Sequence, residues 1–285
     1  MPFGSAKCPV TKEDKLWIEE AMLWLVDQLG SKALCQAEVM LPTEEYFPDK
    51  YLGTQISAEK VVLRVCDYMG VDPSTVQVRI YAEQRNVLPA DSPLYDGIKQ
   101  QHTGTAGMYG AAGRNRKGKK LGVVGIEASK LENPPAVVAT AAHEVGHHIL
   151  VDKRLPQETL ARECLPDLVP VFLGLGILTA NAAFRFFKWQ RAQTSGWEVS
   201  RQGYLSEEMY GYALACFAWL RNEENPVWAK HLTLNIRTYL KKSLSTCTRP
   251  ATRVCRSMPA SRPNSRSRRY VSPIHPPSTS PGNSR

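Results

Sequence analysis

The chain has 285 residues, of which 43% are hydrophobic, so it can bury a sizeable core, and a wholly disordered protein is excluded. Its formal charge of +9 is typical of a nucleic-acid-binding protein, but eight arginines and no acidic residue lie in residues 246–285. Residues 1–245 therefore carry only +1. The C-terminal stretch is rich in proline and serine, which predicts a disordered basic tail. Such a tail could bind nucleic acid by charge alone, but we expect a solvated extension because no platform of aromatic side chains accompanies the arginines.

The first ninety residues alternate between helical and strand patterns. Apolar residues recur at helical spacing from Thr11 to Gly30, which predicts a first helix. Residues 37–41 resemble a strand, and a second helix is expected from its cap at Ser57 through Met69. Residues 75–82 then alternate polar and apolar side chains, as a strand does.

The middle of the chain begins with a glycine-rich, basic stretch from Gly104 to Lys120, which we expect to be a loop because neither P-loop nor Rossmann spacing is present. The apolar run at residues 121–128 predicts a strand. Two prolines then suit the first turn of a helix that includes residues 136–150. Two more helices are expected, opened by Ser206 and by Asn225–Pro226.

These elements predict an α+β fold, in which a small N-terminal sheet with helices is followed by a helical region that carries a zincin-like metal helix. We expect residues 1–245 to form a single globular region. Its α/β part spans about residues 1–90, and its metal-motif and helical part spans about residues 120–245. Residues 246–285 form the disordered basic tail.

Cysteine spacing and the N-terminal residues predict the compartment. The seven cysteines are widely spaced and form no CxxC pair, so we expect reduced thiols. The first fifteen residues lack the apolar segment of a secretory signal, which favours a cytoplasmic protein. The one candidate for a membrane span is Leu168 to Phe184, seventeen uncharged residues with a proline and two glycines. We expect a helix buried in the protein core there, with membrane association as the alternative.

The segment HEVGHH, residues 143–148, is the strongest functional signal. His143 and His147 are four positions apart on one helix face and can bind one cation, while Glu144 beside them can act as a general base. His148 lies about 140° from His143 on a helix of 3.6 residues per turn, so we expect it to pack or hydrogen-bond instead. The helix around the motif is apolar, and a zinc ion would compensate for burying these polar groups. A hydrogen-bonded pair of core histidines is the alternative.

A catalytic zinc site takes three protein ligands and leaves one position for water. The carboxylates that could supply the third ligand are Asp152, Glu158, Glu163 and Asp167. Asp152 is too near to serve, because it lies at the end of the same helix, one turn beyond the metal-facing residues. Glu163 follows His147 by sixteen residues, which leaves room for a turn and a second helix that returns to the metal.

At this point the sequence resembles the gluzincin metallopeptidases, whose HExxH helix is followed by a second helix with an ExxxD motif, here Glu163 to Asp167. The resemblance implies zinc ligation by His143, His147 and Glu163. It also implies that Glu144 is the general base and that Asp167 orients His143 through a hydrogen bond. Two further stretches, FLGLGILTANAAF and YLSEEMYGYALACFAWLR, are similar to parts of uncharacterised bacterial proteins with an HExxH motif.

One residue departs from the gluzincin pattern. Pro166 lies within the ExxxD motif, and if the second helix begins there, Asp167 becomes the alternative third ligand. The sequence predicts a zinc-dependent, metallopeptidase-like hydrolase, with a peptide or protein substrate implied by the family. The alternative is a structural or interaction protein in which zinc braces the helices, with Cys164 as the nearest fourth ligand. Residues that could stabilise a developing oxyanion are Tyr204, Tyr210, Tyr212 and His231.

Overall fold

The computed structural model describes residues 7–82, 107–114, 116–151, 153, 161–182, 205–247 and 254–255. These residues form an α+β fold with a small sheet and a larger number of helical residues, which confirms the predicted fold class. Asp152, Glu158 and Tyr204, three of the candidates named above, lie outside the described residues.

The sheet has three strands in the order β1-β3-β2, where β1 is Val76–Tyr81, β2 is Gly107–Arg114 and β3 is Lys120–Glu127. β1 runs parallel to β3, and β2 runs antiparallel to it. The strands predicted at residues 75–82 and 121–128 are confirmed as β1 and β3. The loop predicted from Gly104 is wrong over residues 107–114, because a run of small residues without apolar alternation can still pair with a buried strand.

Three helices precede the sheet in the chain, α1 (Lys12–Leu29), α2 (Ser31–Gln36) and α3 (Gln55–Tyr68). The predicted start of the first helix is confirmed, since the Thr11 side chain accepts a hydrogen bond from the Asp14 N–H at 3.1 Å. The Thr11 hydroxyl also donates to the Asp14 carboxylate at 2.8 Å. The chain therefore enters α1 through a side-chain cap.

Two local predictions in this part are wrong. Residues 37–41 form an irregular connection instead of a strand, and the Met40 N–H donates to the Gly174 carbonyl at 2.9 Å. Because Gly174 lies in a turn, this hydrogen bond is not part of a ladder between two strands. The cap of α3 is Thr54, whose side chain accepts a hydrogen bond from the N–H of Ser57. Ser57 itself lies inside the helix.

The metal-motif region consists of α5 (Pro134–Leu150) and α6 (Ala161–Phe172). The Asn133 side chain caps α5, and the two prolines occupy its first turn, as predicted. α6 begins before Pro166 and continues past it, although it contains a second proline at position 170. A helix that begins only at Pro166 is therefore excluded.

The apolar stretch of residues 168–184 does not form one helix. α6 ends within it, residues 173–174 turn, and a second helix occupies residues 176–182. Most side chains of residues 168–182 are buried, which confirms a position in the core. Among the described residues, no helix has the length and apolar character needed to cross a membrane.

The last helices are α8 (Glu207–Leu220) and α9 (Leu234–Thr246). Ser206 caps α8 by accepting a hydrogen bond from Met209 N–H, as its sequence position predicts. The single helix expected after Asn225–Pro226 is divided, because a short 3-10 helix precedes α9. Within the residues that the structure describes, 3-10 helices also occupy Pro73–Thr75, Ala128–Lys130 and Val227–His231.

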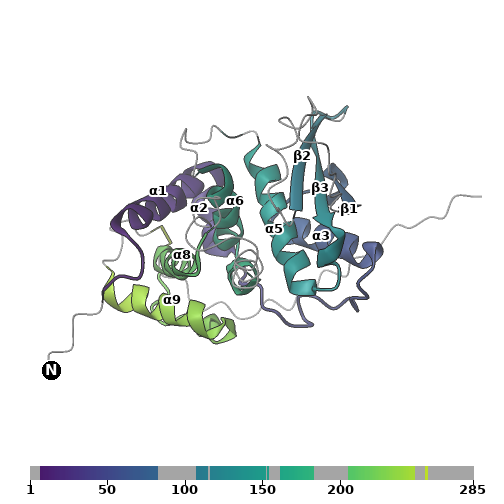
Figure 1. Cartoon of the computed structure of the whole chain (residues 1–285). Coiled ribbons are helices and arrows are strands. Elements are labelled where there is room, and N and C mark those ends of the chain that lie inside the picture. Colours follow the sequence, from purple (N-terminus) through teal and green to yellow (C-terminus); the bar gives the residue numbers. More distant parts are fainter. Residues whose placement is uncertain are drawn as a thin grey trace, which may run out of the picture.

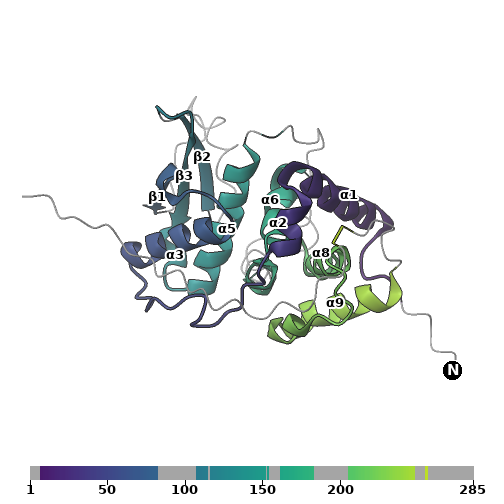
Figure 2. The same ribbon diagram turned by 180° about the vertical axis from the view of Figure 1, so that it is seen from behind.

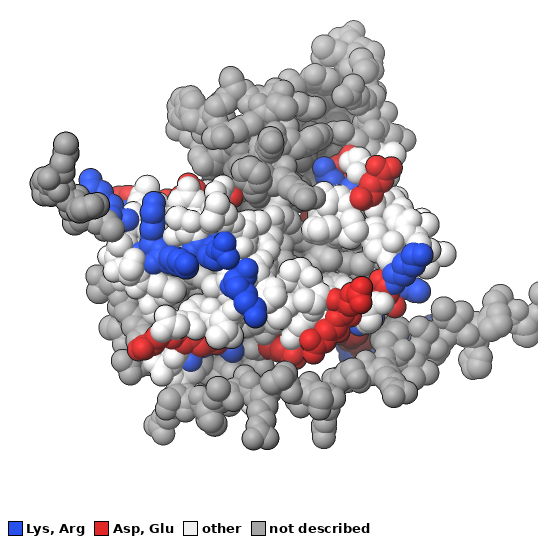
Figure 3. Space-filling view, turned by 90° about the horizontal axis from the view of Figure 1, so that it is seen from below, with Lys and Arg blue, Asp and Glu red and all other residues white. Residues whose placement is uncertain are grey.

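The elements form two groups that meet at α5 and α6. Figure 1 shows the sheet with α3 and α5 on one side, α6 beside α5, and α1, α2, α8 and α9 on the other side. The reverse view in Figure 2 shows the same order. On the face seen in Figure 3, basic and acidic residues form separate rows, and the described surface there is not uniformly basic.

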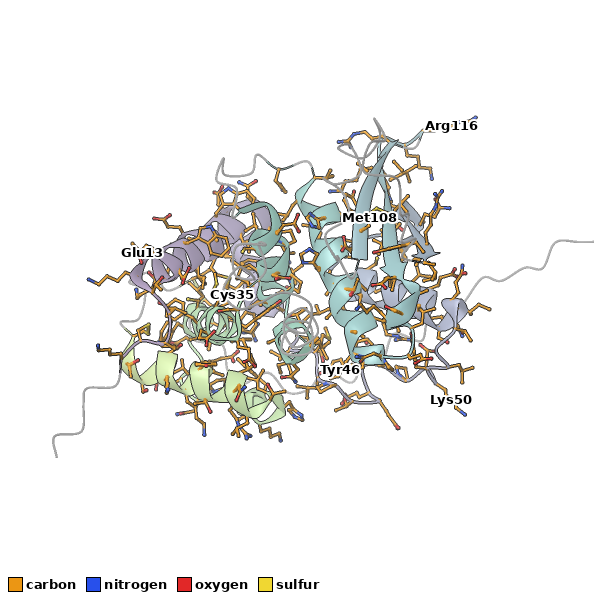
Figure 4. The ribbon with its side chains drawn as sticks, in the orientation of Figure 1. Glu13, Cys35, Tyr46, Lys50, Met108 and Arg116 are labelled. Atoms are coloured by element: carbon orange, nitrogen blue, oxygen red, sulfur yellow. A yellow bond between two sulfur atoms is a disulfide. The ribbon has the colours of Figure 1, made fainter. Side chains whose placement is uncertain are left out.

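Four cysteines form two disulfides, Cys8–Cys247 and Cys35–Cys255, so the prediction of reduced thiols is wrong for these four. The partners are 239 and 220 residues apart, and spacing along the chain gives no indication of such pairs. The Cys255 N–H also donates to the Leu220 carbonyl at 3.0 Å. Parts of the segment assigned to the tail are thus attached to the fold, near α2, where Cys35 is labelled in Figure 4. The remaining tail lies outside the described residues.

Candidate metal centre

Three side chains from α5 and α6 converge on one point. His143, His147 and Glu163 each offer a ligand atom, and these atoms all lie within 4.8 Å of one another. The two histidine Nε2 atoms are 3.2 Å apart. Glu163 Oε2 lies 3.5 Å from Nε2 of His143 and 3.6 Å from Nε2 of His147. The three ligands expected from the sequence therefore meet.

The dimensions of this triangle fit a metal ion. Metal–ligand bonds of about 2.0–2.2 Å at tetrahedral angles place neighbouring ligand atoms roughly 3.3–3.6 Å apart. The observed separations of 3.2, 3.5 and 3.6 Å are close to this range. Two imidazole nitrogens and one carboxylate oxygen are also donors that first-row divalent cations accept. The cluster could bind a metal ion.

Asp167 orients His143 and is not a member of the cluster. Its Oδ1 accepts a hydrogen bond from His143 Nδ1 at 2.7 Å, and its Oδ2 accepts one from Leu205 N–H at 3.1 Å. Because Nδ1 of His143 donates to the carboxylate, the neutral imidazole would present the lone pair of Nε2 to a metal ion. Burial opposes protonation, but the Asp167 carboxylate raises the pKa of His143 well above its ordinary value.

Glu163 is held as an anion by the two histidines. Its partial burial would raise the pKa, yet hydrogen bonds with His143 and His147 lower it to about 2. Its side chain remains 42% exposed, so solvent reaches this side of the cluster. A charged carboxylate with an accessible face is suitable both for ligation and for exchange of small molecules at the centre.

Gly146, inside the HEVGHH segment, allows α6 to approach α5. A Cβ atom at position 146 would lie 2.6 Å from the Pro166 carbonyl oxygen and 3.2 Å from its Cα, too close for any other residue without a shift of backbone. Pro170 has no N–H, so this carbonyl lacks the usual donor four residues later in the helix. Pro166, the residue that departs from the gluzincin pattern, thus lies at the contact between α5 and α6 that brings Glu163 to the histidines.

Glu144 lies next to the ligands in a buried position. It is only 5% exposed, and burial raises its pKa above the ordinary value. The start of β2 covers it, since a Cβ at Gly107 would collide with the Glu144 carboxylate. Figure 4 shows Met108, the next residue, on β2 beside α5. The glycine at position 107 therefore makes space for this carboxylate.

His148 does not join the cluster, in agreement with its angular position on α5. Its Nδ1 lies 3.0 Å from the hydroxyl of Tyr109, and its Nε2 lies 3.4 Å from Thr75 Oγ1. The Tyr109 ring is also nearly parallel to the ring of His147, at 8° and with 6.1 Å between centroids. Sequence reasoning missed Tyr109 because it lies in the glycine-rich stretch that predicts a loop.

The other described candidates do not contribute to the cluster. Tyr210 is buried, and its pKa is raised well above the ordinary value by burial and by Asp167. Tyr212 donates to Glu19 of α1 at 2.6 Å. His231 closes the 3-10 helix before α9, and Cys164 is buried outside the cluster, with its pKa raised to about 12 by burial. None of these four belongs to the described metal-ligand group.

Comparison of the chain with protein-family models, with curated proteins and with solved structures finds no match. The function is therefore inferred from the geometry of the cluster and from the two short motifs that resemble those of gluzincins.

Proposed function

We propose that the protein is a zinc-dependent, metallopeptidase-like hydrolase. The observation that carries the proposal is the meeting of His143, His147 and Glu163, with Asp167 behind one histidine and Glu144 beside both. A bracing zinc needs a fourth protein ligand. Among the described residues the group has three members, which favours a catalytic role over a structural one.

The side chains have separable roles in this proposal. Zinc, when bound, would polarise a scissile carbonyl and acidify water at the centre. His143 and His147 present their Nε2 atoms, and Glu163 supplies a negative charge. Glu144 accepts a proton from the attacking water and delivers it to the leaving amine. Its buried position raises its pKa and so brings its basicity closer to that needed near neutral pH.

The sheet provides support for a peptide substrate in addition to the family resemblance. β2 is an edge strand that pairs, within the described residues, with β3 alone. Figure 1 shows it as the strand nearest α5. An extended peptide can add to the edge strand of a sheet through main-chain hydrogen bonds. Such a peptide would lie beside the helix that carries the two histidines.

The test compares zinc-loaded wild type with Glu144→Gln on a mixed peptide library. Glutamine is nearly isosteric but cannot accept the proton, so hydrolysis should fall by about 10²- to 10⁴-fold while zinc content is retained. Glu127→Gln is the matched control, because Glu127 is also a buried glutamate but bonds with Ser129 at the end of β3. Equal cleavage by wild type and Glu144→Gln would overturn the mechanism. Absence of cleavage together with a fourth protein ligand would favour the structural role.

We propose an oxidising compartment on the basis of the disulfides. A cytoplasmic location is the prediction from sequence, but disulfides persist mainly in oxidising compartments. The two pairs therefore favour an oxidising location. Alkylation of the denatured, unreduced protein from its native cells should modify three cysteines, Cys66, Cys164 and Cys216. Modification of all seven would support the cytoplasm instead.

A further inference from the structure

The two histidine ligands are held in different ways. His143 donates to the carboxylate of Asp167. Among the described residues His147 has no such carboxylate behind Nδ1, and its side chain is 25% exposed. The Tyr109 ring lies parallel to it instead, at 6.1 Å between centroids, within the range of aromatic pairs. The orientation of His147 therefore depends on what fixes Tyr109.

His148 fixes the Tyr109 hydroxyl, and the hydrogen-bond directions can be assigned. Thr75 donates its hydroxyl proton to the Asp72 carbonyl at 2.7 Å, so the contact with His148 Nε2 requires the proton on Nε2. His148 Nδ1 is then an acceptor, and the Tyr109 O–H donates to it at 3.0 Å. His148 is only 2% exposed, so this anchor is buried in the protein.

A glycine on β3 makes space for this anchor. A Cβ at Gly122 would lie 2.6 Å from His148 Nδ1 and 2.7 Å from Tyr109 Cε2. Any residue with a Cβ at position 122 would therefore push the side chains of Tyr109 and His148 apart. Tyr109 of β2, Gly122 of β3 and His148 of α5 thus form one contact, and Tyr109 extends it to the ring of His147.

We propose that Tyr109 is a positioning residue for the ligand His147, and that His148 anchors Tyr109. In HEVGHH, His148 would then help to orient the ring of His147 through Tyr109. The inference depends on metal binding by the cluster, as the proposed function does, but it does not depend on peptidase activity. In this proposal, the Tyr109 ring orients His147, as the Asp167 carboxylate orients His143.

The experiment measures metal binding by the full-length, disulfide-intact protein. Zinc affinity is obtained by competition with a chromophoric chelator, and the coordination geometry is obtained from the visible spectrum of the cobalt(II) form. Tyr109→Leu should weaken zinc binding by about 10- to 100-fold, as loss of a ligand's support does, and should alter the cobalt spectrum. Tyr109→Phe keeps the ring and loses the anchor, so a smaller loss of about fivefold is expected.

Tyr212→Phe is the matched control, since it also removes a hydrogen-bonded tyrosine hydroxyl, but one that donates to Glu19 on α1. It should leave zinc affinity and the cobalt spectrum unchanged. Wild-type affinity and spectrum in folded Tyr109→Leu would overturn the inference. If Tyr109→Leu does not fold, the test is Tyr109→Phe. A zinc affinity of Tyr109→Phe equal to that of Tyr212→Phe would overturn the anchoring role of His148. Failure of the wild type to bind metal would overturn both this inference and the proposed function, whereas metal binding without peptide cleavage would leave this inference supported.

Discussion

The metal centre and the helix group on the other side of α6 are stabilised by different interactions. At the centre, hydrogen bonds and ion pairs join side chains of α5 and α6. The apolar core extends through both regions, and in the helix group it is reinforced by two disulfides between residues far apart in the chain. Metal binding and resistance to unfolding should therefore respond to different substitutions, and each prediction below tests that separation.

The largest effect is expected at the histidine ligands. His143→Ala and His147→Ala should each abolish stoichiometric zinc binding, because two remaining ligands cannot hold the ion. The metal content per chain after dialysis measures this. His148→Ala should retain stoichiometric zinc, with reduced affinity, and His231→Ala should behave as wild type. A full equivalent of tightly bound zinc in His147→Ala would contradict the assignment.

Loss of one disulfide should affect the helix group and leave the centre intact. Cys35→Ser with Cys255→Ser should lower the free energy of unfolding by about 2–5 kcal/mol, because the bridge closes a long loop. Urea unfolding with and without this bridge measures the loss. Zinc stoichiometry should stay at the wild-type value. A variant that loses its zinc while still folded would show that the two regions are coupled.

Gly146→Ala should affect both properties, since the added Cβ meets the Pro166 carbonyl where α5 and α6 touch. We expect a loss of about 1–3 kcal/mol in unfolding free energy and weaker zinc binding, because α6 carries Glu163. Gly211→Ala is the control in the other region. Its Cβ would lie 3.0 Å from Leu240 N, so it should destabilise the protein without changing zinc affinity. Equal zinc affinities in the two variants would refute the role of Gly146.

The smallest effect is expected at Asp167. Asp167→Asn keeps an oxygen acceptor for His143 but removes the charge, so zinc affinity should fall by about 10- to 100-fold without loss of stoichiometry. Chelator competition measures the change. Complete loss of zinc would promote Asp167 to a ligand, which its hydrogen bond with His143 argues against.

Local patterns predicted the helix of the centre and its two histidines, because ligand spacing on one helix is a property of neighbouring residues. The spacing set Asp152 aside and left three other carboxylates as candidates, and the resemblance to gluzincins selected Glu163. No local pattern indicated Tyr109, since its contact with His147 depends on β2 pairing with β3. The function of Gly146 was likewise hidden, because its small size matters only when α6 packs on α5.

The fold could be predicted at the level of its class and most helices, whose caps and apolar spacing are local signals. The disulfides could not, because the two ends of the chain meet only after α1, α8 and α9 have packed. The strand expected at residues 37–41 failed for a similar reason. The Met40 N–H in this segment donates to a carbonyl in the turn after α6 and not to a neighbouring strand. A single sequence does not indicate which partner the backbone takes.

The coordination of zinc in the full-length, disulfide-intact protein is the most direct test of the central claim. Anomalous scattering from a zinc-loaded crystal, at the zinc edge, identifies the site and its ligand atoms. We expect one zinc per chain, bound by Nε2 of His143 and of His147 and by a carboxylate oxygen of Glu163, at about 2.0–2.2 Å, with the fourth position open to water. A fourth protein ligand, or zinc at another site, would contradict the account.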